Sequence, residues 1–421
     1  MKLHSLSIKV VFFVSIMFGH TNQTYAKDSN KIPIMKVLWQ KEVAADANLC
    51  YSPNQVIFDK TTDKLLIASI SFHSLRSKDS SEGKSWLLEV DPHSGDIVKR
   101  SFLKNITGSK ATVISAPLLI SSLTVSENND ITVVGKFDNS VKSIMKVNRR
   151  ANTSKSIEFY GKSNAINKNS GGEDFSLILS GINLSGGNLL LIGGDRDKGL
   201  IIKVDSEGTR LWDRSYRIGQ GQVDLFTDGL AVGNRGEFII VGCSTKVSGK
   251  FPAATGDDFI LQCNAQGDVI AKDIFTGNPW PGEQPRVCQL SRGNFVVVYG
   301  KGMELKHSDV NIRAYSPDLK LLWEKPIVKS EENKPSSFKI AATPKNGFIL
   351  AANIDFGNLR VYEYDENGNQ VANLSKDKEV WLGNIGLACM DKKALVVFQT
   401  RPSTGQGEEL SRIKIIALEL K

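Results

Sequence analysis

Residues 189–214 read LLLIGGDRDKGLIIKVDSEGTRLWDR and contain three strands of a repeating unit. An apolar strand (189–194) ends in glycines, a second strand (201–204) follows, and Asp205-Ser206-Glu207-Gly208 turns the chain into a third strand around Trp212. Asp at the first position of such a turn accepts hydrogen bonds from the backbone that follows it, and Gly at the last position tolerates a positive φ. The segment therefore predicts a meander of antiparallel strands.

The apolar strand of this unit recurs along the whole chain. It starts at Leu65, Ile131, Leu189, Phe238, Phe295, Phe348 and Ala394, so that successive starts are 46 to 66 residues apart. That spacing is about the length of one propeller blade. We label the strands of each blade A to D from the axis outward, with the recurring apolar strand as B. The repeat predicts an all-β fold, a seven-bladed β-propeller with four antiparallel strands in each blade.

The two ends of the chain supply complementary parts of one blade. A strand D without preceding strands stands at 38–41, and strands A, B and C without a following D stand at 385–389, 394–399 and 412–418. We expect the N-terminal strand D to pair with the C-terminal strands A–C, which closes the ring and leaves no exposed inner edge. The D strands share one motif, and its recurrence predicts a structural place for tryptophan between adjacent sheets. The copies are Leu38-Trp39-Gln40-Lys41, Leu211-Trp212-Asp213-Arg214 and Leu322-Trp323-Glu324-Lys325.

The first 26 residues have the pattern of a cleavable signal peptide. Lys2 and Lys9 flank a short apolar core at 10–19, and Thr24-Tyr25-Ala26 predicts cleavage after Ala26. No run of 18 or more apolar residues follows, so the sequence predicts no membrane span. We expect a periplasmic or secreted protein in which residues 27–421 form a single domain and a monomer.

The charge of the chain limits the classes of partner. The formal net charge is +8, and removal of Lys2 and Lys9 leaves +6 (8 − 2). The basic residues are dispersed between the strands, which does not favour a nucleic-acid partner. Net charge bears on association and not on fold, so an anionic protein or a cell-envelope polymer stays open as the partner.

The five cysteines show no CxxC or Cys/His spacing that would bind a metal. We interpret them as small buried residues. Cys50 and Cys389 lie in the strands expected to meet where the ring closes, and a disulfide between them is an open alternative. No calcium loop or phosphate-binding loop occurs either, so we expect no cofactor and no metal.

The sequence offers little for catalysis. No GxSxG motif is present, and three histidines follow the signal segment, namely His73, His93 and His307. His93 falls in a C–D turn, whereas His73 and His307 begin the B–C loops of two blades on opposite sides of the ring. We expect no catalytic residue. A hydrolase or lyase with its site at the mouth of the central channel remains the alternative.

Loop lengths distinguish the two faces of the predicted ring. The A–B and C–D connections are tight turns, whereas the B–C and D–A connections are long and irregular, and variable loops on a rigid scaffold commonly carry binding sites. Trp280 lies in the proline-flanked D–A loop Gly277-Asn278-Pro279-Trp280-Pro281-Gly282 and is a candidate low-entropy anchor, unless it only caps the sheet beneath. Phe251 and Arg286 complete the expected binding patch. Arg217, His73 and His307 are the further candidates on that face.

The repeat resembles a known group of propellers. The order strand B, strand C, D-x-x-G-x-x-x-W, as in residues 201–212, is similar to the quinoprotein-like and delta-60-type repeats of bacterial exported propellers, and the similarity covers essentially the whole mature chain. The resemblance implies the fold and not an activity. Quinoprotein dehydrogenases have eight blades, an adjacent-cysteine disulfide ring and a Ca²⁺-linked cofactor, and this chain has seven repeats and no Cys-Cys pair. The hypothesis is therefore an exported non-catalytic protein that recognises a protein or cell-envelope partner through its B–C/D–A face.

Overall fold

The computed structural model describes residues 32–43, 50–72, 84–103, 117–125, 130–137, 141–148, 153–159, 176–195, 197–218, 223–233, 235–246, 255–277, 284–304, 307–328, 335–354, 357–400 and 412–421. Within them the secondary structure is β-strand apart from one 3₁₀ turn at Ser185–Gly187. No helix in this part of the chain is long and apolar enough to cross a membrane.

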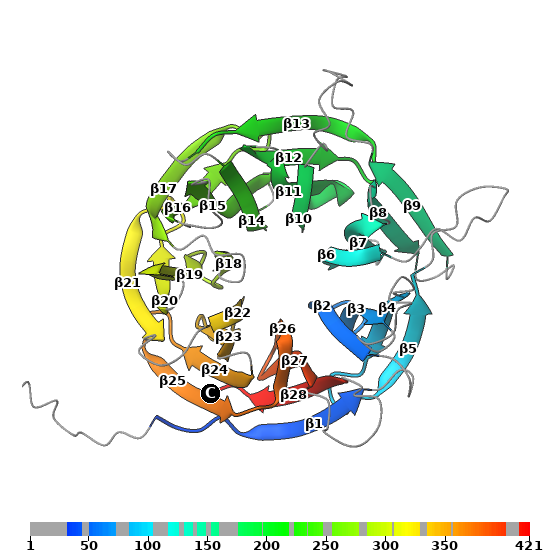
Figure 1. Cartoon of the computed structure of the whole chain (residues 1–421), viewed down its shortest axis with the longest axis vertical. Coiled ribbons are helices and arrows are strands. Elements are labelled where there is room, and N and C mark those ends of the chain that lie inside the picture. The colour runs from blue at the N-terminus through cyan, green and yellow to red at the C-terminus, as the bar shows by residue number, and fades with distance from the viewer. Residues whose placement is uncertain are drawn as a thin grey trace, which may run out of the picture. The chain divides into compact units, whose positions relative to one another are not determined.

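The described strands form seven four-stranded antiparallel sheets (Figure 1). From the innermost strand outward, the first three are β2 (Cys50–Asp59), β3 (Lys64–Phe72), β4 (Lys84–Val90) and β5 (Ile97–Phe102); β6 (Pro117–Val125), β7 (Ile131–Phe137), β8 (Val141–Asn148) and β9 (Thr153–Phe159); and β10 (Ser176–Asn183), β11 (Leu189–Asp195), β12 (Lys198–Val204) and β13 (Arg210–Tyr216).

The next three sheets follow the same plan in chain order. They are β14 (Val223–Val232), β15 (Glu237–Lys246), β16 (Thr255–Cys263) and β17 (Val269–Gly277); β18 (Arg286–Gln289), β19 (Phe295–Glu304), β20 (His307–Tyr315) and β21 (Leu321–Val328); and β22 (Pro335–Ala342), β23 (Phe348–Ile354), β24 (Asn358–Tyr364) and β25 (Gln370–Lys376).

The last sheet joins the two ends of the chain. It contains β26 (Val380–Met390), β27 (Lys393–Thr400), β28 (Ile413–Glu419) and, as its outermost strand, β1 (Val37–Val43). β1 runs antiparallel to β28, with Trp39 opposite Ala417 and Lys41 opposite Ile415. A strand from the start of the chain thus supplies the outer edge of the C-terminal sheet.

The innermost strands make a closed circuit. β2 contacts β6, β6 contacts β10, and the contacts continue through β14, β18, β22 and β26 back to β2. The sheets are therefore arranged radially about one axis, as Figure 1 shows when the ring is viewed down that axis. The predicted all-β propeller is confirmed.

Burial is greatest in the second strand of a sheet and falls toward the outer edge. Every residue of β23 is buried, whereas the outermost strand β17 alternates between partly buried and exposed positions until its end. A strand covered on both faces needs a continuous apolar run, and an outer strand does not. Apolar clusters fill the spaces between adjacent sheets; in one of them Val298 and Ile312 pack with Phe338 and Leu350 of the next sheet.

The tight turns have the predicted hydrogen bonds. Asp205 Oδ1 accepts from the backbone N–H groups of Glu207 (2.8 Å) and Thr209 (2.7 Å), and Asn264 Oδ1 does the same two and four residues further on, at 3.0 and 2.8 Å. Gly267 follows with a φ of +89°, which L side chains rarely adopt. The Asx residue and the glycine therefore specify one turn together.

The three D-strand tryptophans lie between sheets, as their recurrence predicted. Each ring lies against the C–D turn glycine of the next sheet, where a Cβ atom would come within 2.6 to 3.0 Å of it. The pairs are Trp39 with Gly95 (2.7 Å), Trp212 with Gly267 (3.0 Å) and Trp323 with Gly368 (2.6 Å). We call each pair a Trp–Gly clasp. Two sequence signals that looked separate, the tryptophan and the turn glycine, are thus the two halves of one contact.

A basic residue accompanies each clasp. It stands two positions after the tryptophan and contacts the residue after the glycine in the next sheet. Lys41 pairs with Asp96, Arg214 pairs with Asp268, and Lys325 Nζ donates to Asn369 Oδ1 (3.1 Å).

The disulfide considered for Cys50 and Cys389 is wrong. Cys50 pairs with Phe72 at one end of its sheet, whereas Cys389 pairs with Ala394 at the other end and has a free thiol. Innermost strands all run in one direction, so about seven rungs, roughly 20 Å, separate the two levels. A disulfide needs Cα atoms about 4.4–6.8 Å apart.

The other cysteines fit the prediction of small buried residues. Cys243, Cys263 and Cys288 are buried with free thiols, and Cys243 and Cys263 pair with other residues rather than with each other. Burial raises the pKa of the Cys263 thiol to about 12, so the thiol stays neutral.

Candidate functional site at the centre of the ring

The register of the innermost strands places seven residues at one level around the axis. Each pairs with the fourth residue of the recurring B strand in its own sheet. In ring order they are Gln55, Ser122, Ser180, Asp228, Arg286, Lys339 and Gly386. We call this set the axial layer. Three consecutive positions carry charge, and the other four are neutral.

The described charged side chains of the axial layer are accessible. Asp228, Arg286 and Lys339 are each partly exposed although they stand on innermost strands whose faces are covered by neighbouring sheets. Among the neutral members, Gln55 and Ser180 are also partly exposed. The axial layer therefore lies at the inner edge of the sheets, where part of each of these residues remains exposed.

A β-bulge sets the position of Asp228. The register of β14 against β15 shifts between Phe226 and Asp228, so Thr227 is an extra residue in the strand. Bulges redirect neighbouring side chains and free backbone groups from the ladder. Here the Thr227 hydroxyl donates to the Pro285 carbonyl (2.9 Å), and the Thr227 carbonyl accepts from Arg286 Nη1 (2.9 Å).

Further contacts join the sheets that carry Asp228 and Arg286. Asp228 Oδ2 accepts from the backbone N–H of Val287 at 3.2 Å. The single hydrogen bond of Arg286 to Thr227 fixes the guanidinium, which has five N–H donors. Most of those donors have no partner among the residues that the structure describes. Arg286 is therefore positioned but not neutralised.

Lys339 completes the charged part of the layer from the next sheet. Burial and the nearby Arg286 guanidinium lower its pKa to about 8, and Asp228 opposes that shift. The sheets of Asp228 and Lys339 are not neighbours, since the sheet of β18 lies between them. The charge of Asp228 therefore acts on Lys339 past the intervening sheet. No hydrogen bond or ion pair of Lys339 occurs within the described ranges.

An apolar level lies next to the axial layer, toward the tight A–B turns. The innermost residues that pair with the second residue of each B strand are Ile57, Thr124, Ile182, Leu230, Cys288, Ala341 and Ala388. Six of these seven are apolar or thiol residues. The charged residues of the axial layer thus lie next to an apolar level, on the side that faces the B–C and D–A loops.

Arg286 is the one predicted site residue that lies in the axial layer. Arg217 follows the outermost strand β13, forms an ion pair with Asp197, and makes no contact with Arg286 in the described part of the chain. His307 is the first residue of strand β20, opposite Glu304, and not a loop residue as expected. Its side chain lies outside the described residues, as do Trp280, Phe251 and His73.

Asp228 and Lys339 were not found from the sequence. Their signal was available, because each is a charged residue at the middle of an otherwise largely apolar innermost strand. The segments are DLFTDGLAV for Asp228 and SSFKIAA for Lys339. A charge at such a position is costly to bury unless it has a partner or a function.

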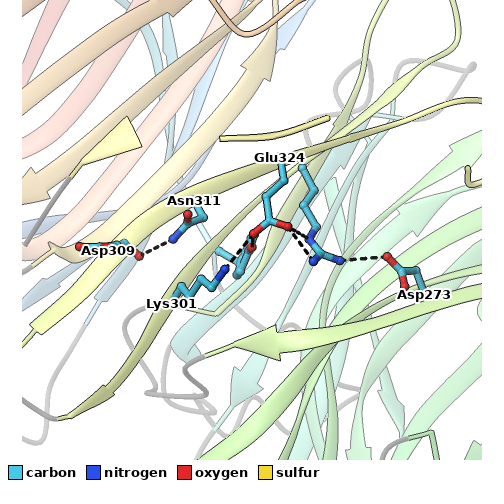
Figure 2. A network of polar contacts seen from close by, with 7 residues as sticks. Asp273, Lys301, Asp309, Asn311 and Glu324 are labelled. Atoms are coloured by element: carbon cyan, nitrogen blue, oxygen red, sulfur yellow. Dashed lines mark hydrogen bonds and ion pairs between the residues drawn. The ribbon is translucent and has the colours of Figure 1, made fainter. Parts of the chain in front are cut away.

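A second charged cluster lies between the sheets that end in β17 and β21 (Figure 2). The Arg313 guanidinium donates to Asp273 Oδ2 (3.0 Å) and to Glu324 Oε2 (2.8 Å), and lies 4.3 Å from the centre of the Phe275 ring. Lys301 Nζ also donates to Glu324, at 3.0 Å. Because the cations and carboxylates are matched at hydrogen-bond distance, we interpret this cluster as a structural link between blades.

Comparison with known proteins adds the fold alone. No family model and no curated protein matches the chain. A crystal structure of a protein of unknown function from Dyadobacter fermentans DSM 18053 is 10% identical, with 93% of this chain and 100% of that chain covered and a TM-score of 0.52. A structure described as the Dos1 propeller is also 10% identical, with 91% and 95% coverage and a TM-score of 0.49. At this identity the first likeness indicates a shared fold.

Proposed function

We propose that this protein is an exported, non-catalytic binding protein of the quinoprotein-like propeller group, which engages a protein or cell-envelope partner through its B–C/D–A face. The proposed partner presents negative charge at the centre of that face. The proposal combines the signal-like N-terminus, the long loops on one face and the charged members of the axial layer.

The observation that carries the proposal is the imbalance of charge in the axial layer. Arg286 and Lys339 place two cationic groups at the centre, and Asp228 is the one acidic member of the layer. Asp228 accepts a backbone hydrogen bond, and Arg286 binds a carbonyl oxygen, so neither neutralises the other by direct contact among the described residues. Cationic groups arranged in this way attract and orient an anionic partner.

The experiment is an affinity capture from envelope extract with residues 27–421 as bait. The test variants are Trp280→Ala and Arg286→Ala. The matched control is Arg292→Ala, which removes an exposed arginine from an A–B turn on the opposite face, where it pairs with Glu366. We expect a stoichiometric partner that is retained by the control and lost with Arg286→Ala. Equal retention by all three variants, or no partner at all, would contradict the proposal.

An enzyme remains the second candidate because of Lys339. An amine with a pKa of about 8 is close to the range in which a general base operates near neutral pH. A hydrolase or lyase with its site at the centre of the ring requires this amine for turnover. Loss of activity on a screened substrate in Lys339→Met, with the partner capture unchanged, would favour the enzyme.

A further inference from the structure

We propose that the axial layer is a binding site for a small carboxylate ligand, held between the Arg286 guanidinium and the Lys339 amine. This inference goes beyond the capture of a macromolecular partner and does not depend on it. It rests on the depth of the layer, its charge balance and the chemistry of its neutral side.

The depth of the layer limits the size of the ligand. The axial layer pairs with the fourth residue of each B strand, about 10 Å from the tight-turn end of the sheets. Seven innermost strands surround it in a closed circuit. A small molecule or one protruding group reaches this level more readily than the body of a macromolecule.

The net charge of the axial layer indicates a ligand that carries one negative charge. Arg286 and Lys339 contribute two positive charges, and Asp228 contributes one negative charge, so the described layer has a net charge of +1 when Lys339 is protonated. One carboxylate neutralises that charge, whereas a sulfate dianion exceeds it. The free edge of a guanidinium matches the two oxygens of a carboxylate.

The surroundings of Lys339 make its protonation depend on the ligand. Facing it are Arg286, whose charge opposes protonation, and Asp228, whose charge favours it. The thiols of Cys288 and Cys389 lie two and three rungs further toward the tight turns, and burial raises their pKa values above the usual range, so they stay neutral. A bound carboxylate adds a negative charge near Lys339 and raises the pKa of the amine.

The neutral side of the layer can hold the rest of the ligand. Ser180 contributes a hydroxyl group and Gln55 an amide, and both side chains are partly exposed. Gly386 leaves no room for a side chain, because a Cβ atom there would collide with Val56. The site therefore has charged groups on one side and uncharged polar groups on the other.

The test is saturation-transfer NMR of propionate with residues 27–421, at pH 7 and at pH 9.5, with butyrate and sulfate as competitors. Lys339→Met and Arg286→Gln are the test variants. Lys272→Met, which changes an exposed lysine on the outermost strand β17, is the control.

We expect saturable propionate binding at pH 7 that falls at least fivefold at pH 9.5 and at least tenfold in each test variant, with no change in the control. Sulfate should compete less well than either carboxylate. The proposal is overturned by an absence of saturable binding, by equal binding in all variants, or by sulfate binding as tightly as propionate. Because no envelope extract is used, a negative result here leaves the capture experiment unaffected.

Discussion

The two charged clusters of this propeller are built in opposite ways. In the Arg313 cluster, the guanidinium lies between Asp273 and Glu324, and Tyr315 and Tyr299 each donate to one of these carboxylates, at 2.9 and 2.7 Å. In the axial layer, Arg286 and Lys339 share one acidic neighbour, and burial disfavours the charge on Lys339. A cluster that supports the fold has its charges matched within the chain. A cluster whose charges are unmatched is better explained by a ligand from outside.

The largest expected effect comes from breaking the matched cluster. Arg313→Met leaves Asp273 without its cation and Glu324 with Lys301 alone, and because these groups are partly buried the expected cost is about 2 kcal/mol. We expect chemical denaturation to show a loss of that size in the free energy of unfolding. A change below about 1 kcal/mol would mean that the cluster is not a structural link.

A substitution in the axial layer should change the free energy of unfolding in the opposite direction, toward higher stability. Lys339→Met keeps a side chain of similar length and removes a charge that burial disfavours, so the free energy of unfolding at pH 7 should increase by roughly 1–2 kcal/mol. Denaturation of the two proteins side by side measures it. Destabilisation by Lys339→Met would show that Lys339 supports the fold and would remove the contrast between the clusters.

The two clusters should also affect the pH dependence of the free energy of unfolding in different pH ranges. The folded state lowers the pKa of Lys339 to about 8, so the unfolded chain holds more protons above that pH, and stability attributable to Lys339 rises from about pH 8 toward the ordinary lysine value. For Glu324, burial raises the pKa, but hydrogen bonds from Tyr299 and Lys301 and the charge of Arg313 outweigh burial and lower it. The stabilisation that Glu324 contributes to the folded state is therefore present above the ordinary pKa of a glutamate and is lost as the pH falls below it.

Denaturation midpoints from pH 3 to pH 10.5 test these signs. Above pH 8, the free energy of unfolding of the wild-type protein should rise relative to that of Lys339→Met, because the variant has no amine at this position to lose a proton. A fall in the Lys339-dependent part of stability above pH 8 would contradict the assignment.

A smaller effect is expected at the Trp–Gly clasps, which carry no unmatched charge. Gly368→Ala introduces a Cβ atom 2.6 Å from the Trp323 ring at a φ of +71°, so we expect a loss of about 1–2 kcal/mol in the free energy of unfolding. Gly233→Ala is a control with a positive φ and open space around it. Equal losses in both variants would show that backbone strain alone, and not the clasp, sets the effect.

The least effect is expected from the exposed ion pair of a clasp. Lys41 and Asp96 are both well exposed, and exposed pairs contribute little because solvent screens them. Lys41→Met should leave the thermal midpoint unchanged within error. A clear loss would show that the clasp depends on its charges and not on the tryptophan.

Much of the architecture was readable from the sequence because it is repeated. The B strands, the Asx turns and the tryptophans recur at matching places, and each copy supports the assignment of the others. The axial layer was not readable because its members come from seven strands with no shared motif. The A–B turns also differ in length, so Asp228 stands ten residues before the start of its B strand and Arg286 nine residues before the start of its own, which hides their equivalence. The disulfide considered for Cys50 and Cys389 failed for a related reason, since strand order was predicted but the level along the axis was not.

The titration of Lys339 tests most directly the claim that the centre of the ring carries unmatched charge. Competitive labelling of lysine amines in the wild-type protein between pH 6 and pH 11, followed by mass spectrometry, gives the midpoint for Lys339. We predict a midpoint near pH 8, more than one unit below the value of about 10.4 for a free lysine side chain. A midpoint at or above the free value would mean that Lys339 is neither desolvated nor close to Arg286, and it would contradict the account.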